Sequence, residues 1–326
     1  MTVLRVGTRG SALALNQTRD IAERIGTKAG VEIEIVPVTT HGDVSRESLA
    51  SLGGTGVFTG ALREALLAGE CDLVVHSLKD LPTTPADGIV LAAVPRRADR
   101  RDALCARDGL TFETLPAGAR VGTGSPRRIA QVRAARPDVQ VVDIRGNVDS
   151  RLARVYDEAT DAERRLDAVV LAAAGLGRLG RTDAVTEYLD ANAWPTAPGQ
   201  GALALETRGS EGRPDLDRTV ARALTAIDHA TTRACVTAER AVLAGLEAGC
   251  SAPLAATALV EDGLLFVSAT AYRLDGTASI TSSHAASLDS PGLPSLLEAA
   301  NDAAARVVAE LLENGAGDLT SAGAAR

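Results

Sequence analysis

Residues 5–11 read Arg-Val-Gly-Thr-Arg-Gly-Ser and residues 120–125 read Arg-Val-Gly-Thr-Gly-Ser, so one short strand-and-turn pattern occurs twice. In both copies the turn is followed by a helical pattern, a strand, a second helix and a buried strand, which lies at residues 72–75 in the first copy and 167–170 in the second. Strands that alternate with helices are typical of α/β folds with largely parallel sheets. We therefore predict two similar α/β lobes.

Two segments predict where the chain passes between the lobes. Residues 95–101 form the first crossing, and residues 194–201 (Trp-Pro-Thr-Ala-Pro-Gly-Gln-Gly) interrupt regular structure and form the second. Later segments, a helical stretch at 227–246, three short strands and a closing helix at 293–314, predict a small third domain with an antiparallel sheet, followed by a frayed tail. We place the first lobe at residues 1–97 and 199–217, the second lobe at 98–198 and the C-terminal domain at 218–326. A cleft between two such lobes is a common ligand site.

The composition excludes several classes of protein. With 326 residues, 45% hydrophobic and 23% charged, the chain is long enough for several cores, and its 2% aromatic content makes those cores aliphatic. The net charge of −8 and the scarcity of aromatic residues argue against a nucleic-acid binder. The sequence has no apolar run of about 18 residues and no export-signal pattern, so we expect a cytoplasmic protein without membrane partners. The four cysteines, at positions 71, 105, 235 and 250, lack metal-ligand spacing, which predicts free thiols and no metal site.

Arginines accompany both turns. A turn between a strand and a helix presents backbone N–H groups and a positive helix end to an anion, although Ser11 and Ser125 are also good helix N-caps. Arginine binds carboxylates through two parallel hydrogen bonds. Such arginines stand in or after the turns, at Arg9, Arg127, Arg128, Arg145, Arg151 and Arg178. Taken singly each fits a solvated surface, but together they predict a cleft for a ligand with several carboxylates or phosphates. The missing phosphate-loop motif argues against a nucleoside triphosphate.

Three other features are candidates for chemistry. The segment from His76 to Asp80 follows a buried strand, where α/β proteins place catalytic side chains, and Lys79 is one of only two lysines. The alternative is a surface ion pair between Lys79 and Asp80, which would contribute little. Cys250 lies in a Gly-Cys-Ser-Ala-Pro turn, where a thiol can be exposed and reactive. The glycine-rich residues 51–58 suit a mobile lid as well as an ordinary loop.

These motifs occur together, and in the right order, in one known family. The chain resembles porphobilinogen deaminase (hydroxymethylbilane synthase) over essentially its whole length, on the motifs Gly7-Thr8-Arg9-Gly10-Ser11-Ala12-Leu13-Ala14, His76-Ser77-Leu78-Lys79-Asp80-Leu81-Pro82, Arg145-Gly146-Asn147-Val148, Pro198-Gly199-Gln200-Gly201 and Gly249-Cys250. The resemblance implies a transferase of heme and other tetrapyrrole biosynthesis, which joins four porphobilinogen molecules head to tail, with loss of ammonia, into hydroxymethylbilane. It also implies two lobes like those of periplasmic binding proteins, a small third α+β domain, and a monomer.

The resemblance also implies roles for individual residues. A dipyrromethane cofactor, made from two substrate units, would be bound through a thioether to Cys250. Asp80 would be the catalytic residue that stabilises the cationic azafulvene and assists proton transfer. The cofactor site would comprise Cys250, Ser77, Lys79, Asp80, Thr123, Ser125, Arg127, Arg128, Arg145 and Gly146. The substrate site would comprise Arg9, Ser11, Phe58, Arg145, Arg151, Arg178 and Gln200, with the arginines on the acetate and propionate arms.

The chain departs from the family pattern in two places. Ser51 and Thr55 stand where the lid of the family often carries lysines, and Gly124-Ser125 stands where a serine pair is common. Both changes remove candidate anion contacts without touching Cys250 or Asp80. The alternative function is a non-catalytic, two-lobed binding protein or sensor for an anionic small molecule, which would need neither Cys250 nor Asp80.

Overall fold

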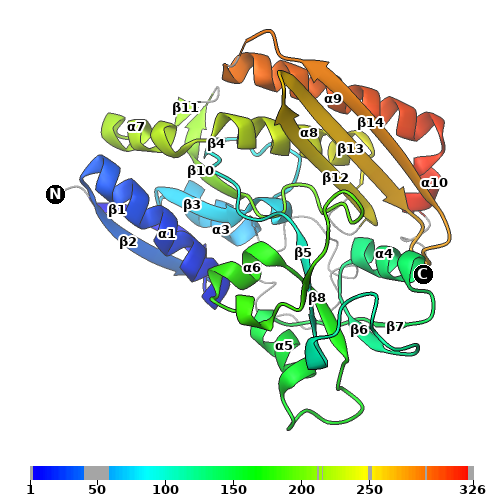
Figure 1. Cartoon of the computed structure of the whole chain (residues 1–326). Coiled ribbons are helices and arrows are strands. Elements are labelled where there is room, and N and C mark those ends of the chain that lie inside the picture. Colours follow the sequence, from blue (N-terminus) through cyan, green and yellow to red (C-terminus); the bar gives the residue numbers. More distant parts are fainter. Residues whose placement is uncertain are drawn as a thin grey trace.

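The computed structural model describes residues 3–39, 59–210, 213–214, 216–248, 252–290 and 292–321. These residues form three β-sheets with helices packed against them (Figure 1). The two larger sheets belong to the two lobes, and the third belongs to the carboxyl-terminal part of the chain. The predicted fold class, two α/β lobes with a small third sheet domain, is therefore confirmed. Among the described residues, none of the helices combines the length and the apolar character that crossing a membrane requires.

The sheet of the first lobe has the strand order β11-β10-β3-β1-β2, and β4 also pairs with β10. Strand β1 runs parallel to β2 and β3, whereas β10 runs antiparallel to β3. The strands are β1 (Val3–Arg9), β2 (Glu32–Val38), β3 (Leu73–Ser77), β4 (Ile89–Ala93), β10 (Leu203–Ser210) and β11 (Arg213–Pro214). The helices that pack against them are α1 (Ala12–Ala29), α3 (Gly60–Leu67) and α7 (Arg218–Ile227).

The sheet of the second lobe has the strand order β7-β6-β8-β5-β9. Strand β6 runs parallel to β7 and β8, whereas β5 runs antiparallel to β8. The strands are β5 (Asp102–Ala106), β6 (Arg120–Gly122), β7 (Gln140–Val142), β8 (Ala168–Ala172) and β9 (Glu187–Tyr188). The helices of this lobe are α4 (Pro126–Ala135), α5 (Val148–Tyr156) and α6 (Ala173–Arg178).

The two sheets repeat one topology, which confirms the repeat predicted from the sequence. The strands β2-β1-β3-β10 correspond in order and direction to β7-β6-β8-β5. In each lobe the antiparallel strand enters from a crossing, because β5 begins directly after residues 95–101 and β10 begins shortly after residues 194–201. The sheet of each lobe therefore includes a strand that begins just after the chain has crossed over from the other lobe. The two crossings thus connect the two sheets directly.

The helical stretch predicted at residues 227–246 is confirmed as a helix that begins three residues later and ends one residue earlier. Helix α7 ends at Ile227, and α8 (Ala230–Gly245) begins after Asp228, whose Oδ1 accepts a hydrogen bond of 2.7 Å from the backbone N–H of Val94. Helix α7 buries Val220 and Leu224 in the core of the first sheet, although it lies beyond the predicted boundary at residue 217. The domain boundaries themselves remain a prediction.

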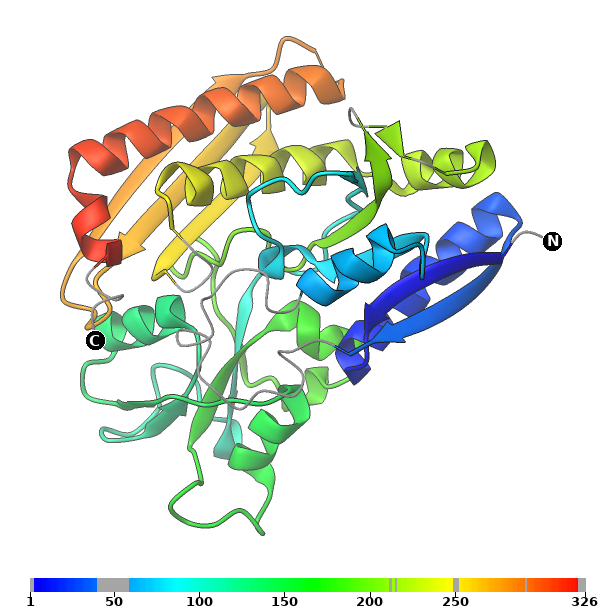
Figure 2. The same ribbon diagram turned by 180° about the vertical axis from the view of Figure 1, so that it is seen from behind.

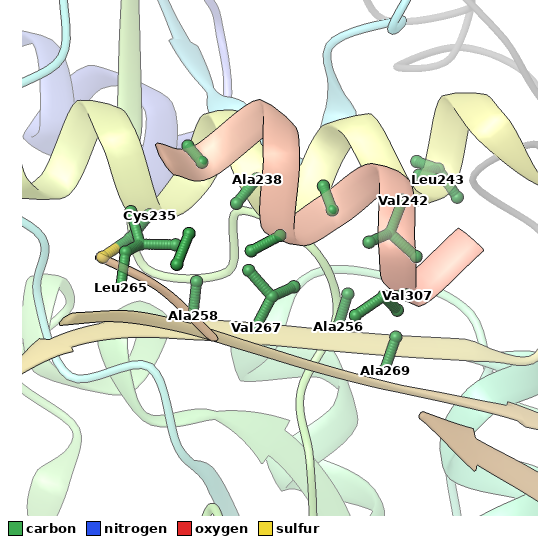
Figure 3. Close-up of a cluster of buried hydrophobic side chains, with 14 of the residues drawn as sticks. Cys235, Ala238, Val242, Leu243, Ala256, Ala258, Leu265, Val267, Ala269 and Val307 are labelled. Atoms are coloured by element: carbon green, nitrogen blue, oxygen red, sulfur yellow. The ribbon is translucent and has the colours of Figure 1, made fainter. Parts of the chain in front are cut away.

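The third sheet is antiparallel, as predicted, and consists of β12 (Leu254–Glu261), β13 (Leu264–Tyr272) and β14 (Ser279–Ser287). Helix α8 and helix α9 (Leu293–Glu313) cover it, and the core between them is made largely of alanine, valine and leucine (Figure 3). The helices approach closely, because a Cβ on Gly245 would lie 2.8 Å from Val308 Cγ2. The tail was expected to be frayed; instead α10 (Ala316–Ser321) follows α9, and it is held by the burial of Ala316 and Leu319.

A buried carboxylate joins the third domain to both crossings. Glu239 in α8 is fully buried and accepts hydrogen bonds of 2.6 and 3.0 Å from Nη1 and Nη2 of Arg97, in the first crossing. It also accepts bonds from the backbone N–H groups of Gly199 (2.7 Å), in the second crossing, and Ala258 (3.0 Å), in β12. The four bonds satisfy a charge that would otherwise be costly to bury.

Replacing Glu239 by alanine removes this junction and leaves the Arg97 guanidinium without its carboxylate. We expect the free energy of unfolding to fall by about 3–5 kcal/mol, the usual effect of breaking a buried ion pair. The measurement is urea unfolding followed by circular dichroism. Asp99→Ala is the matched control, because it breaks the exposed pair with Arg101 and should cost less than about 1 kcal/mol. Equal effects of the two substitutions would contradict this role for Glu239.

Candidate active site

A pocket opens at the carboxyl end of β3, beside the amino-terminal end of α1. It brings together five residues that were predicted for the site. They are two cations, two hydroxyls and one carboxylate: Arg9, Lys79, Ser11, Ser77 and Asp80. Its other lining residues are Leu13, Ala14, Gln17, Thr59, Leu62, Val75 and His76. Gln17 was not predicted, although its position four residues after Leu13 places both on one face of α1. The pocket therefore combines an apolar wall with groups that bind anions.

The turn that carries Lys79 and Asp80 is held by three parts of the chain. Ser77 ends β3, and Leu78–Asp80 form a short 3₁₀ turn in which Leu78 is fully buried. Gly199, with φ of 73°, packs against this turn, and a Cβ there would lie 2.8 Å from Leu78 Cδ2. From the third domain, Arg240 donates hydrogen bonds of 2.6 Å to the carbonyls of both Leu81 and Pro82. These contacts fix the backbone from which Asp80 projects.

The two turns of the repeat differ in how their serines are used. The Ser11 hydroxyl accepts a 3.3 Å hydrogen bond from the Ala14 N–H and so caps α1. Ser125 precedes α4 but makes no such capping bond. Thr123, predicted for the cofactor site, is buried below the second turn, where its hydroxyl accepts a 3.3 Å bond from the Ser125 N–H. The amino-terminal end of α4 therefore keeps donor capacity for an anion.

The charge centre of the second lobe is Asp102, which the sequence analysis did not single out. Its carboxylate is fully buried. Its Oδ2 accepts bonds from Arg127 Nη1 (2.9 Å) and Trp194 Nε1 (3.1 Å). Its Oδ1 accepts bonds from Arg128 Nη2 (2.6 Å) and Gln200 Nε2 (2.8 Å). Burial raises the pKa of Asp102, but the two arginines outweigh burial and hold that pKa well below its usual range.

Arg127 and Gln200 do not line the pocket, although both were predicted to bind ligand. Arg127 is 2% exposed, and its Nη1 also donates to Gln131 Oε1 (2.7 Å) and the Pro195 carbonyl (3.1 Å). Gln200 is 1% exposed; its amide donates to the Arg100 carbonyl (2.8 Å) and accepts from Arg128 Nη2 (3.3 Å). Most polar groups of these two side chains are bonded within the protein. The structure therefore shows both side chains bound to Asp102, and it does not show them facing the pocket.

Lys79 links the pocket to this charge centre. Burial lowers its pKa to about 8, and the positive charges of Arg128 and Arg127 act in the same direction against the opposing effect of Asp80 and Asp102. Lys79 of the first lobe therefore interacts electrostatically with Arg127 and Arg128 of the second lobe. An anion beside Lys79 would restore the usual preference of the ammonium for its charged form.

Further arginines extend the positive region. Burial lowers the pKa of Arg151 to about 10, with Arg128 and Arg145 acting in the same direction, and its Nε donates a 2.9 Å bond to the Gly146 carbonyl. Arg145 is exposed. Arg178 ends α6, and its Nη2 donates a 2.9 Å bond to the Gly201 carbonyl in the second crossing.

The donor set fits a cofactor with several carboxylates. The Nε atoms of Arg127 and Arg128 are buried and have no hydrogen-bond partner among the residues that the structure describes. Buried donors of this kind are costly unless a ligand satisfies them. Among the residues that the structure describes, the main charged groups that interact around Lys79 and Arg151 are five cations and three carboxylates: Lys79, Arg127, Arg128, Arg145, Arg151, Asp80, Asp102 and Asp143. The excess of positive charge favours an anionic ligand. No group of three or more potential metal ligands occurs in the described part of the chain.

Some predicted features lie outside the described residues. These are Phe58, the glycine-rich segment with Ser51 and Thr55, and the cysteine proposed to bind the cofactor, Cys250. The described cysteines, Cys71, Cys105 and Cys235, are buried free thiols. Burial raises the pKa of Cys105 to about 12 and that of Cys235 to about 11, which makes both thiols poor nucleophiles.

Comparisons with known proteins agree with the family resemblance. The family model described as "Porphobilinogen deaminase, dipyromethane cofactor binding domain" matches residues 4–214, and that of the "Porphobilinogen deaminase, C-terminal domain" matches residues 233–302. The chain is 66% identical to the porphobilinogen deaminase of Leifsonia xyli subsp. xyli, over 97% of this chain and 94% of that protein. It is 49% identical to that of Thermobifida fusca, over 99% of this chain and 98% of that protein. Among solved structures, the methionine-binding protein MetQ aligns with 68% of this chain and 89% of its own, at 11% identity and a TM-score of 0.43.

The lowered pKa of Lys79 is directly measurable, because the chain has only one other lysine, Lys28. After reductive methylation with ¹³C-formaldehyde, the two lysines and the amino terminus give separate NMR signals, and the Lys79 signal is the one that a Lys79→Arg variant lacks. We expect the Lys79 signal to titrate with a midpoint near 8. The ammonium is charged below that pH, so its attraction for anions is lost as the pH rises through this midpoint. A midpoint near the ordinary value of 10.5 would show that Lys79 is solvated and distant from the arginines.

Proposed function

The chain belongs to the porphobilinogen deaminase family, and we propose that the pocket beside Asp80 is the place where it carries out the family's reaction. That reaction is a step of porphyrin biosynthesis: the enzyme, a transferase, joins four porphobilinogen molecules into hydroxymethylbilane and releases ammonia. It uses a dipyrromethane cofactor, which supplies the pyrrole chain to which substrate units are added. The observation that carries our assignment is that Asp80, Lys79 and Arg9 line one pocket next to the arginines around Asp102.

In this assignment Asp80 is the catalytic residue. Ammonia leaves from the protonated aminomethyl group of the substrate: the C–N bond breaks with both electrons on nitrogen, and the positive charge of the ammonium passes to the substrate methylene and pyrrole ring. A carboxylate held on a fixed turn stabilises this charge more than it stabilises the neutral ring, which lowers the barrier. After the new C–C bond forms, the attacking pyrrole carbon must lose its proton, and the same carboxylate is within the pocket to accept it.

We assign the carboxylate arms of substrate and cofactor to the cations and open donors around this pocket. Arg9 and Ser11 would hold the arms of the incoming substrate, and Arg145, Arg151 and Arg178 those of the growing chain. The residues proposed to hold the cofactor arms are Ser77, Lys79, Ser125, Arg128, Arg145 and Gly146. Among these groups the Arg128 guanidinium is buried, and a desolvated guanidinium binds carboxylates more strongly than an exposed one does.

Three predicted residues take an indirect part in this proposal. Arg127 and Gln200 act on the ligand through Asp102 and Arg128, because their own hydrogen bonds are largely made within the protein. Thr123 shapes the turn before α4 through its bond to the Ser125 N–H. Phe58 remains assigned to stacking on a pyrrole ring, on the resemblance alone.

We further propose that Cys250 holds the cofactor through a thioether. It is the remaining cysteine after the three buried free thiols. In the sequence it stands between α8 and β12, and Arg240 of α8 holds the turn of Asp80. The family precedent and the unpaired state of the described cysteines support a monomer in the cytoplasm. The predicted domain limits, at 97/98, 198/199 and 217/218, are proposed on the same precedent.

Asp80→Asn keeps the size of the side chain and removes its charge. We expect kcat for ammonia release from porphobilinogen to fall by about 100-fold or more, because the charge that stabilises the transition state is lost. The protein should remain folded, with an unchanged circular dichroism spectrum. Asp87→Asn is the control, since Asp87 is an exposed carboxylate on the following loop, and its kcat should equal that of the unmodified enzyme. Full activity of Asp80→Asn would remove Asp80 from the catalytic role.

A further inference from the structure

The hairpin between β13 and β14 rests on helix α4 of the second lobe. In both views the ends of these strands lie beside that helix (Figure 1 and Figure 2). Gly276, in the hairpin, has φ of 80°, and a Cβ there would lie 2.6 Å from the Ala134 nitrogen and 2.9 Å from the Ala130 carbonyl oxygen. Such distances are far below van der Waals contact, so only glycine permits this approach of two backbones.

Polar and apolar contacts extend the docking. Arg133 Nη1, on α4, donates a 2.9 Å hydrogen bond to the Leu274 carbonyl in the hairpin. Tyr272, the last residue of β13, packs with Ala130 and Ala255 in a small buried cluster. The Tyr272 hydroxyl accepts a 3.2 Å bond from Gln131 Nε2. The third domain therefore contacts the helix that carries Arg127 and Arg128 near its beginning.

Gln131 connects this contact to the charge centre. Its Oε1 accepts a 2.7 Å bond from Arg127 Nη1, and its Nε2 donates a 2.8 Å bond to the Pro195 carbonyl. A guanidinium only donates and a carbonyl only accepts, so the orientation of the Gln131 amide is fixed. The buried chain of contacts thus runs from Tyr272 through Gln131 to Arg127, and from there through Asp102 to Arg128.

We propose that Tyr272 and Gln131 are positioning residues, through which the docked hairpin of the third domain sets the affinity of the site for carboxylate arms. This inference rests on the proposed function, in which Arg128 and Lys79 bind those arms. The physical reason is that Arg127 and Arg128 share the single negative charge of Asp102. While Arg127 is held on one carboxylate oxygen, Asp102 neutralises only part of the charge of Arg128. When the hairpin is displaced, Arg127 loses a constraint, Asp102 pairs more fully with Arg128, and the attraction for the ligand falls.

The sharpest test compares two glycines of the third domain that have the same backbone strain. Gly276→Ala and Gly263→Ala both place a Cβ at positive φ, 80° and 75° respectively. Only the first meets α4, since no atom of the described residues lies within 4 Å of a Cβ on Gly263. For each holoenzyme we would measure the fraction of chains that carry cofactor, by denatured intact mass, together with KM and kcat for porphobilinogen. We expect Gly276→Ala to raise KM about three- to tenfold, the equivalent of one lost hydrogen bond. Its cofactor fraction should fall while kcat stays within about twofold, and Gly263→Ala should change neither KM nor cofactor fraction.

A milder pair of variants decides the matter if Gly276→Ala does not fold. Tyr272→Phe removes only the hydroxyl that meets Gln131 and should raise KM about threefold. Tyr156→Phe is its control, because the Tyr156 hydroxyl donates to the Ala106 and Ala184 carbonyls of the second lobe, and its KM should not change. If Tyr272→Phe matches Tyr156→Phe in KM and in cofactor fraction, the proposal is wrong.

Arg128→Ala separates this proposal from the function on which it rests. If Arg128→Ala raises KM and lowers the cofactor fraction while Gly276→Ala and Tyr272→Phe change neither, the arms bind as proposed and the hairpin has no part in it. If Arg128→Ala itself leaves both quantities unchanged, the assignment of Arg128 to the arms fails, and the positioning role fails with it.

Discussion

The carboxylate of Asp102 accepts hydrogen bonds from four side chains in two parts of the chain that are distant from it in sequence, and the charge of the site depends on this one buried group. Its partners, Arg127, Arg128, Trp194 and Gln200, come from α4 and from the second crossing, while Asp102 itself begins the strand that follows the first crossing. Two guanidinium groups and one carboxylate leave an excess of positive charge inside the protein. Such an excess is unfavourable by itself and becomes favourable when an anionic ligand binds. The excess positive charge around Asp102 therefore favours the binding of carboxylates.

Helix α8 of the third domain contacts both the crossings and the turn that carries Asp80. Consecutive residues of this helix have separate partners: Glu239 binds Arg97 and Gly199 at the crossings, and Arg240 binds the carbonyls that follow Asp80. The helix can serve both because its apolar side chains pack in the small-residue core against its own sheet (Figure 3), while Glu239 and Arg240 reach the crossings and the turn of Asp80. In the sequence, Cys250 follows this helix, which ends at Gly245. One element therefore connects the crossings, the catalytic turn and the cysteine proposed to hold the cofactor.

Much of this arrangement could be predicted from sequence, for identifiable reasons. The repeated turn at residues 5–11 and 120–125 indicated two lobes because strand, turn and helix follow one another locally, and Asp80 stood out because it follows a buried strand. The burial of Arg127 could not be predicted, because it depends on Asp102, 25 residues away, and on Pro195, 68 residues away. Asp102 itself follows two arginines and has the local pattern of a surface ion pair. Helix α10 was missed because a short polar tail gives no periodic signal, although Leu319 buries against the third domain.

The positive site is proposed to hold a dipyrromethane that is attached covalently at Cys250. The denatured intact mass of the purified protein, beside that of its Cys250→Ser variant, tests this attachment most directly. We predict that the unmodified chain exceeds its polypeptide mass by one dipyrromethane unit and that the variant does not, before or after incubation with porphobilinogen. A bare polypeptide mass that porphobilinogen fails to raise, or an equal excess in both proteins, would contradict the account. The first result would deny the cofactor, and the second would move its attachment to another residue.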